Sequence, residues 1–223
     1  MTDYEAARSS PDAMVNFMHE ALHGRAVLPR WKPDEHYSTG LARCVRDGDP
    51  EVQRSMRNGA LVLLRRFCES GEWEPGYVFE LLNFIGGLYD GEEFARPLMD
   101  LAWRFHLYDI PLDVRRHVLN ALVDMRPPRT AQFWIDIAEK HPRYIHQAFS
   151  GLLLVDRINA MRLLHLFSDK EGEANAVILK LDVAYDRAPE LERQWFLSII
   201  KAEMPSCGKG LSDAIAVWME TKS

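Results

Sequence analysis

Hydrophobic positions along this chain recur at the spacing of an α-helix. After Ser10-Pro11, the apolar residues Met14, Phe17 and Met18 lie three and four positions apart, so they share one helical face. Ser10 suits the N-cap of this helix, and Pro11 suits its first turn. Comparable stripes follow at 52–67, 114–125, 133–138, 145–153, 158–167, 177–185, 191–199 and 211–219. Sustained strand-like alternation is missing. The pattern therefore predicts an all-α fold.

Short helix breakers separate these stripes. They are Ser70-Gly71, Asp90-Gly91, Pro127-Pro128, His141-Pro142, Ala188-Pro189 and the segment 205–210. The pattern predicts eleven or twelve helices of ~10–17 residues, with loops so short that sequential helices pack antiparallel. Because no linker or low-complexity tract divides the chain, we expect a single domain over 1–223, with residues 1–10 as a poorly ordered N-terminus.

One predicted helix carries a motif that resembles a known repeat family. Asp113-Val114-Arg115 is followed by Val118 and then by Ala121-Leu122. Looser copies begin at Val52, Tyr144 and Leu191, at irregular spacings. The segment resembles the second helix of HEAT repeats, and the whole pattern is similar in architecture to HEAT and armadillo α-solenoids. The resemblance implies stacked antiparallel helical hairpins that form an α-α superhelix. A compact irregular helical bundle is the alternative.

Composition and charge narrow the class of partner. The net charge is −6 and the pI about 5.8, which disfavours broad binding to nucleic acid or to anionic lipid. Arginines crowd the first third of the chain, and Arg54 and Arg57 within that cluster are candidate partner-binding residues. A solvated face with nearby carboxylates is the alternative reading of the cluster.

The six tryptophans divide into two groups. Trp103, Trp134, Trp195 and Trp218 fall within helical stripes, where core packing is expected. Trp195 belongs to the stripe formed by Leu191, Trp195 and Ile199. Trp31 and Trp73 fall in predicted loops, so they are candidate anchors for a protein partner.

The expected compartment is the cytoplasm. No run of ~20 apolar residues is present that could cross a bilayer, and the first residues lack the apolar block of a secretory signal. Cys44, Cys68 and Cys207 are odd in number and far apart, which favours free thiols.

The sharpest chemical motif is His19-Glu20-Ala21-Leu22-His23, an H-E-x-x-H sequence. On a helix this spacing puts both imidazoles on one face, where they can bind Zn²⁺ together. Its similarity to zincin peptidases implies His19 and His23 as metal ligands and Glu20 as the general base.

The rest of the sequence gives this motif little support. Glu35 or His36 would have to supply the third ligand, and neither matches a zincin spacing. Both histidines fall on the polar side of their helix, away from Met14 and Met18. We therefore expect no metal or other cofactor, and retain a zinc-dependent hydrolase as an alternative function.

A second alternative is a HEAT-like DNA glycosylase. Phe133, Trp134 and Asp136, with Arg126, Arg129 and Arg143 nearby, resemble its mixture of aromatic, acidic and basic residues. Trp134 lies on an apolar stripe, and the acidity of the chain argues against a DNA groove.

Since no catalytic constellation stands out, the favoured function is a non-enzymatic interaction module that binds another protein on its helical-repeat surface. An acidic binder would suit a basic, nucleic-acid-directed partner, as in a bacterial immunity or antitoxin protein. That step is an analogy at the level of the fold.

Overall fold

The computed structural model describes residues 6–8, 10–26, 36–70, 75–88, 91–105, 110–167 and 171–222. Within these ranges all regular structure is helical, with twelve α-helices, three 3-10 helices and no strand, which confirms the all-α prediction. Contacts between Cα atoms divide the chain into two compact units, Met1–Pro127 (unit 1) and Pro128–Ser223 (unit 2). Each unit is described by itself below. That the two fold as one domain stays a prediction.

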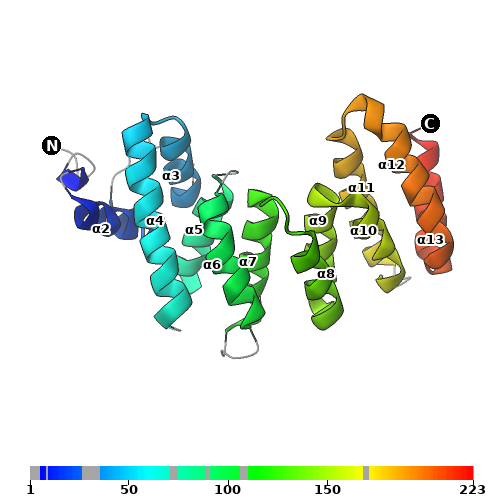
Figure 1. Cartoon of the computed structure of the whole chain (residues 1–223), viewed down its shortest axis with the longest axis horizontal. Helices are drawn as coiled ribbons and strands as arrows, with labels where there is room; N and C mark the ends of the chain where they lie inside the picture. Colours follow the sequence, from blue (N-terminus) through cyan, green and yellow to red (C-terminus); the bar gives the residue numbers. More distant parts are fainter. Residues whose placement is uncertain are drawn as a thin grey trace. The chain divides into compact units, whose positions relative to one another are not determined.

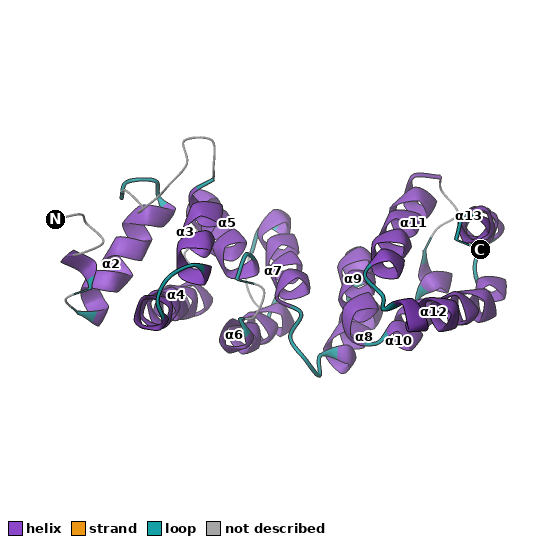
Figure 2. Ribbon diagram, turned by 90° about the horizontal axis from the view of Figure 1, so that it is seen from above, coloured by secondary structure: helices purple, strands orange, loops and turns teal. Residues whose placement is uncertain are grey.

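Unit 1 is built from two rows of helices. They are α2 (Pro11–Leu22), α3 (Tyr37–Arg46), α4 (Pro50–Ser70), α5 (Pro75–Gly86), α6 (Glu92–Trp103) and α7 (Leu112–Met125). Helix α2 packs on α4 and α4 on α6, whereas α3 packs on α5 and α5 on α7. Figure 2 shows α3, α5 and α7 side by side, with α4 and α6 in a second row. Most helices of unit 1 thus pack mainly on a helix two places away along the chain, while α6 also packs closely on α7.

Local signals in the sequence set several helix starts in unit 1. Ser10 Oγ accepts a hydrogen bond from Ala13 N at 3.1 Å, so Ser10 caps α2 as predicted. Asp49 Oδ1 accepts from Glu51 N and Val52 N, both at 3.0 Å, and thereby caps α4. The repeat-like motif at 113–122 forms most of α7 and buries its apolar residues Val114, Val118, Ala121 and Leu122.

Unit 2 contains the remaining elements, and its α-helices also form two rows. They are α8 (Ala131–Lys140), η1 (Pro142–Tyr144), α9 (Ile145–Val155), α10 (Arg157–Arg162), η2 (Leu164–Leu166), α11 (Glu171–Asp186), α12 (Glu190–Glu203), η3 (Met204–Ser206) and α13 (Lys209–Glu220). Helix α9 packs on α11 and α11 on α13, while α10 packs on α12 (Figures 1 and 2).

The core of unit 2 depends on one close approach between helices. Trp134 of α8 is 1% exposed, which confirms its predicted core position. The indole packs against Gly151 of α9 so closely that a Cβ at that position would collide with the ring. At the other end of the unit, Trp218 Nε1 donates to Asp182 Oδ1 at 2.9 Å and joins α13 to α11.

Two further sequence expectations concern the thiols and the membrane. None of the three cysteines forms a disulfide, as predicted, and burial raises the pKa of the Cys68 thiol to about 12. In the part of the chain that the structure describes, no helix combines the length and the apolar character that crossing a bilayer requires.

Candidate functional site

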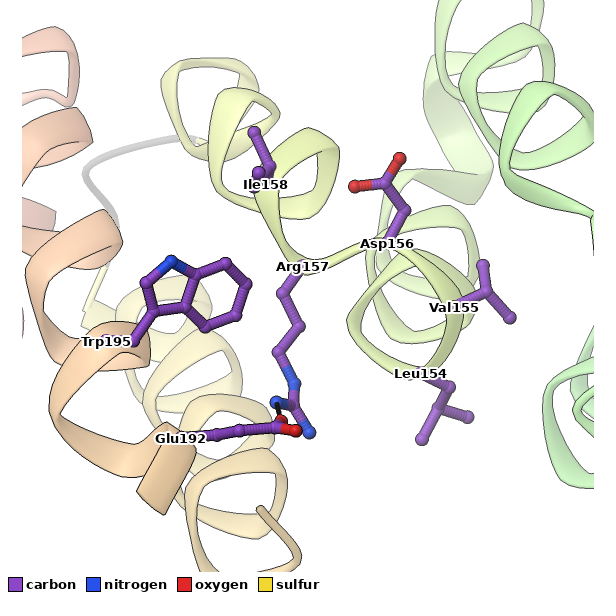
Figure 3. A pocket seen from close by; sticks show the side chains of 7 residues that line it. All are labelled: Leu154, Val155, Asp156, Arg157, Ile158, Glu192 and Trp195. Atoms are coloured by element: carbon purple, nitrogen blue, oxygen red, sulfur yellow. Dashed lines mark hydrogen bonds and ion pairs between the residues drawn. The ribbon is translucent and has the colours of Figure 1, made fainter. Parts of the chain in front are cut away.

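An open concave feature lies in unit 2, between α10 and α12. It is an open cavity of about 610 Å³ (Figure 3). Its lining residues come from the end of α9, the start of α10 and the first two turns of α12: Leu154, Val155, Asp156, Arg157, Ile158, Glu192 and Trp195. We call this feature the α10–α12 groove.

The sharp turn between α9 and α10 creates one wall of the groove. Asp156 Oδ1 accepts a hydrogen bond from Asn159 N at 3.1 Å, and Oδ2 accepts from Asn159 Nδ2 at 2.6 Å. This N-cap starts α10 only one residue after α9 ends at Val155. Because the chain turns so tightly, Arg157 and Ile158 directly follow the end of α9 and face the groove.

An ion pair crosses the groove. Arg157 Nη1 lies 2.7 Å from Glu192 Oε2, and the Arg157 guanidinium carbon lies 5.4 Å from the centre of the Phe196 ring. The Arg157 side chain is mostly buried, whereas that of Glu192 is about half exposed. Since the Arg157 charge is matched by Glu192, Asp156 leaves the lining with one net negative charge.

Exposed apolar side chains border the groove. Trp195 is 47% exposed, Ile158 is 44% exposed, and Leu191, one turn before Trp195 on α12, is 96% exposed. The expectation that Leu191, Trp195 and Ile199 form the buried stripe of this helix is therefore wrong. The structure buries Phe196, Leu197 and Ile200 instead. Both sets have helical spacing, and packing against neighbouring helices selects between them.

The partner-binding residues predicted from sequence lie elsewhere. Trp31 and Trp73 fall outside the described residues. Arg54 is exposed on α4, and Arg57 Nη1 lies 3.0 Å from Glu93 Oε1, which ties α4 to α6. A role in partner binding for these four residues stays a prediction. The sequence did not predict the groove because Trp195 has the helical spacing of a core residue.

The H-E-x-x-H motif forms an aromatic cluster at the end of α2. The His19 and His23 rings lie 4.6 Å apart between centres, and both pack on Tyr77 of α5, at 5.0 and 4.8 Å. Glu20 Oε1 lies 3.2 Å from His19 Nδ1 and 3.6 Å from the Arg25 guanidinium. The sequence placed both histidines on the polar side of α2, but it gave no sign that Tyr77 would cover them. They are half-buried rather than fully solvated.

The cluster offers incomplete support for a metal. Among the described residues, no group of three or more His, Cys, Asp or Glu side chains is placed to hold a metal ion. Of the two proposed third ligands, Glu35 lies outside the described residues, and His36 is exposed just before α3. The Tyr77 hydroxyl is buried without a hydrogen-bond partner among the described atoms, and burial raises its pKa to about 12. Zinc binding at this motif stays the alternative to the expected absence of a metal.

The residues considered for a DNA-repair site do not form an open aromatic pocket. Phe133 and Trp134 are both buried, and their rings pack edge to face at 4.9 Å. Asp136 accepts a hydrogen bond from Gln132 at 2.7 Å and pairs with Lys140 at 3.4 Å. Arg126, Arg129 and Arg143 are exposed. Because Trp134 is buried in the core, its ring is not accessible to stack on a nucleobase.

Comparison with known proteins supplies no relative for this chain. No family model, no curated protein and no solved structure matches it. The argument for function therefore rests on the residues and geometry given above.

Proposed function

We propose that this chain is a non-enzymatic protein-interaction module, and that its partner docks in the α10–α12 groove. The observation that carries the proposal is that the exposed Trp195 and Ile158 both line an open cavity, with the exposed Leu191 one turn before Trp195 on α12. Tryptophan is enriched among the residues that dominate binding energy at protein interfaces. Contiguous exposed apolar side chains with a polar rim are typical of docking surfaces.

The packing order of the helices supports a HEAT-like architecture for this module. In both units helices two places apart along the chain pack on each other, as α4 on α6 and α9 on α11, and consecutive helices such as α8 and α9 also pack closely. Stacked antiparallel hairpins produce this order, because each hairpin buries its apolar stripe against the next one. We propose that the helices form such hairpins, as the motif at 113–122 predicts.

The charges around the groove indicate the chemistry of the partner. Asp156 and Glu192 line the groove, and because Glu192 is paired with Arg157, Asp156 supplies the net negative charge of the lining. Glu190 precedes Leu191 at the start of α12. We propose that the occupant is an amphipathic segment of another protein. It would insert a large apolar side chain beside Trp195 and present a lysine or arginine to these carboxylates.

This chemistry is compatible with an inhibitory role. A chain with a net charge of −6 is suited to a basic protein that itself acts on nucleic acid. An immunity-type or antitoxin-type protein that covers the basic face of a toxin has this property. The comparison is one of fold and charge.

The proposal is tested by site-specific crosslinking followed by measured affinity. A photo-crosslinking residue at position 195 or at position 158 should capture the partner in the native host. The same residue at Val217, which is exposed on α13 outside the groove lining, is the matched control. Trp195→Ala should weaken binding of the purified partner by roughly 30-fold, which corresponds to about 2 kcal/mol. Val217→Ala should change affinity less than about twofold.

Two results would count against the proposal. Equal capture from positions 195 and 217, or unchanged affinity of Trp195→Ala, would exclude the groove as the docking surface. The basic character of the partner has its own test, because a charge-steered association slows as salt rises. An association rate independent of salt would contradict that part alone.

A further inference from the structure

A half-buried lysine in unit 2 contacts a hydroxyl group instead of a carboxylate. Lys180 of α11 lies with its Nζ 2.5 Å from Ser150 Oγ of α9. Ser150 Oγ in turn donates to the backbone oxygen of His146, one turn earlier on α9, at 2.8 Å. Lys180, Ser150 and His146 are separate from the residues that line the α10–α12 groove. We call them the Lys180 cluster.

Other lysines of the unit that are held in contacts pair with acids. Lys140 Nζ lies 3.4 Å from Asp136, and Lys222 Nζ lies 2.7 Å from Asp182 and 3.6 Å from Asp186. Among the described residues, Lys180 Nζ has no carboxylate within ion-pairing distance. Partial removal from water without a counter-ion disfavours the charged ammonium form.

Burial acts in the same direction on both basic groups of the Lys180 cluster. Burial lowers the pKa of Lys180. Burial and, second, the charge of Lys180 lower the pKa of His146, which faces the cluster from α9 and packs on Phe167. Glu173, earlier on α11, opposes this shift at His146. Burial thus raises the neutral fraction of both basic groups of the cluster, and a neutral amine is a nucleophile while an ammonium is not.

We propose that Lys180 is an acylation site, where its side-chain amine accepts an acyl group from an activated donor such as a thioester or an acyl phosphate. The Nζ lone pair attacks the carbonyl carbon of the donor and forms a C–N bond. The bond from that carbon to sulfur, or to the phosphate oxygen, then breaks, and the leaving thiolate or phosphate keeps the electron pair. The proton released from Nζ passes to the leaving group through solvent. The product is an amide, which is uncharged at any pH and needs no counter-ion between α9 and α11.

The test compares acylation of individual lysines in the whole chain. The protein is treated with acetyl phosphate to low conversion near pH 7, and the extent at each lysine is measured by peptide mass spectrometry. Lys201, which is exposed on α12, is the internal reference. We expect Lys180 to be acetylated at least roughly fivefold faster than Lys201, because each unit of pKa difference changes the neutral fraction about tenfold. The excess should shrink near pH 10, where ordinary lysines also become neutral.

A second variant tests whether the missing counter-ion is the cause. Ser150→Asp places a carboxylate beside Nζ, which should stabilise the ammonium and abolish the excess at Lys180 while Lys201 reacts as before. Circular dichroism and unchanged labelling of Lys201 establish that this variant is folded. Lys180 reacting no faster than Lys201 near pH 7 would overturn the proposal. So would an excess that persists in folded Ser150→Asp.

Discussion

The two units differ in how they treat their large apolar side chains. Among the described residues, unit 1 leaves only Val62 and Leu112 exposed, at 37% and 40%. Unit 2 is shorter, yet it exposes seven: Ile158, Leu166, Leu179, Val183, Leu191, Trp195 and Val217. Scattered exposed apolar residues are normal on any protein, but a concentration of them in one unit is typical of a contact surface.

Charge is distributed in the opposite way. Unit 1 holds 20 acidic and 15 basic residues, a net charge of −5, whereas unit 2 holds 13 and 12, a net charge of −1. Net charge favours solubility, and an apolar surface with little net charge favours association. Exposed large apolar side chains among the described residues are therefore concentrated in unit 2, while unit 1 supplies most of the overall acidity.

The variant with the largest expected effect, Gly151→Ala, tests whether the two units are stable independently of each other. Gly151→Ala would force a methyl group into the Trp134 ring. We expect it to lower the free energy of unfolding of unit 2 by about 1–3 kcal/mol, as overpacked cores do. Hydrogen exchange followed by mass spectrometry would measure protection separately in 1–127 and 128–223.

The matched control is Gly172→Ala, because nothing lies within 4 Å of the added Cβ at that position of α11. Alanine there should leave the stability unchanged or raise it by up to about 1 kcal/mol, since glycine weakens helices. Equal loss of protection in both units of Gly151→Ala would contradict independent stability and favour the single domain that the sequence predicts.

Local chemistry explains which parts of the fold the sequence could predict. Ser10 and Asp49 accept hydrogen bonds within their own helix starts, so α2 and α4 are visible without tertiary information. The helical periodicity likewise identifies α7 and the core position of Trp134. These features depend only on residues that are close in sequence.

The candidate site depends on tertiary contacts that the sequence does not encode locally. Helix α12 has two apolar stripes, and only the packing on α10 decides that Phe196 is buried while Trp195 is exposed. The contact between Lys180 and Ser150 joins residues 30 positions apart. The same holds for Tyr77, which covers His19 and His23 from a different helix. Periodicity carries no information on such pairs.

A smaller effect on stability is expected in unit 1, at the cluster of His19, His23 and Tyr77. His23 stacks on Tyr77 at 4.8 Å with an angle of 17° between the rings. His23→Ala should therefore destabilise unit 1 by about 1 kcal/mol, the worth of an aromatic pair plus some lost burial. Urea unfolding with and without equimolar zinc measures this destabilisation. The control is His36→Ala, because His36 is exposed.

The same measurement decides the role of the motif. If the cluster serves packing alone, zinc should leave the unfolding midpoint of the wild-type chain unchanged. A zinc-dependent rise that is lost in the double variant His19→Ala/His23→Ala would instead show a metal site. That result would support the alternative function, a zinc-dependent hydrolase, for unit 1.

The smallest effect on stability is expected at Leu191, where the comparison between the units is sharpest. Because this side chain is 96% exposed, Leu191→Ser should change the free energy of unfolding by less than about 0.5 kcal/mol. It should nevertheless shorten retention on a hydrophobic-interaction column more than Val62→Ser in unit 1 does. A loss above about 1 kcal/mol would mean that Leu191 is buried in the folded protein. The stripe Leu191, Trp195 and Ile199 would then be the core face of α12, and the apolar border of the groove would not exist.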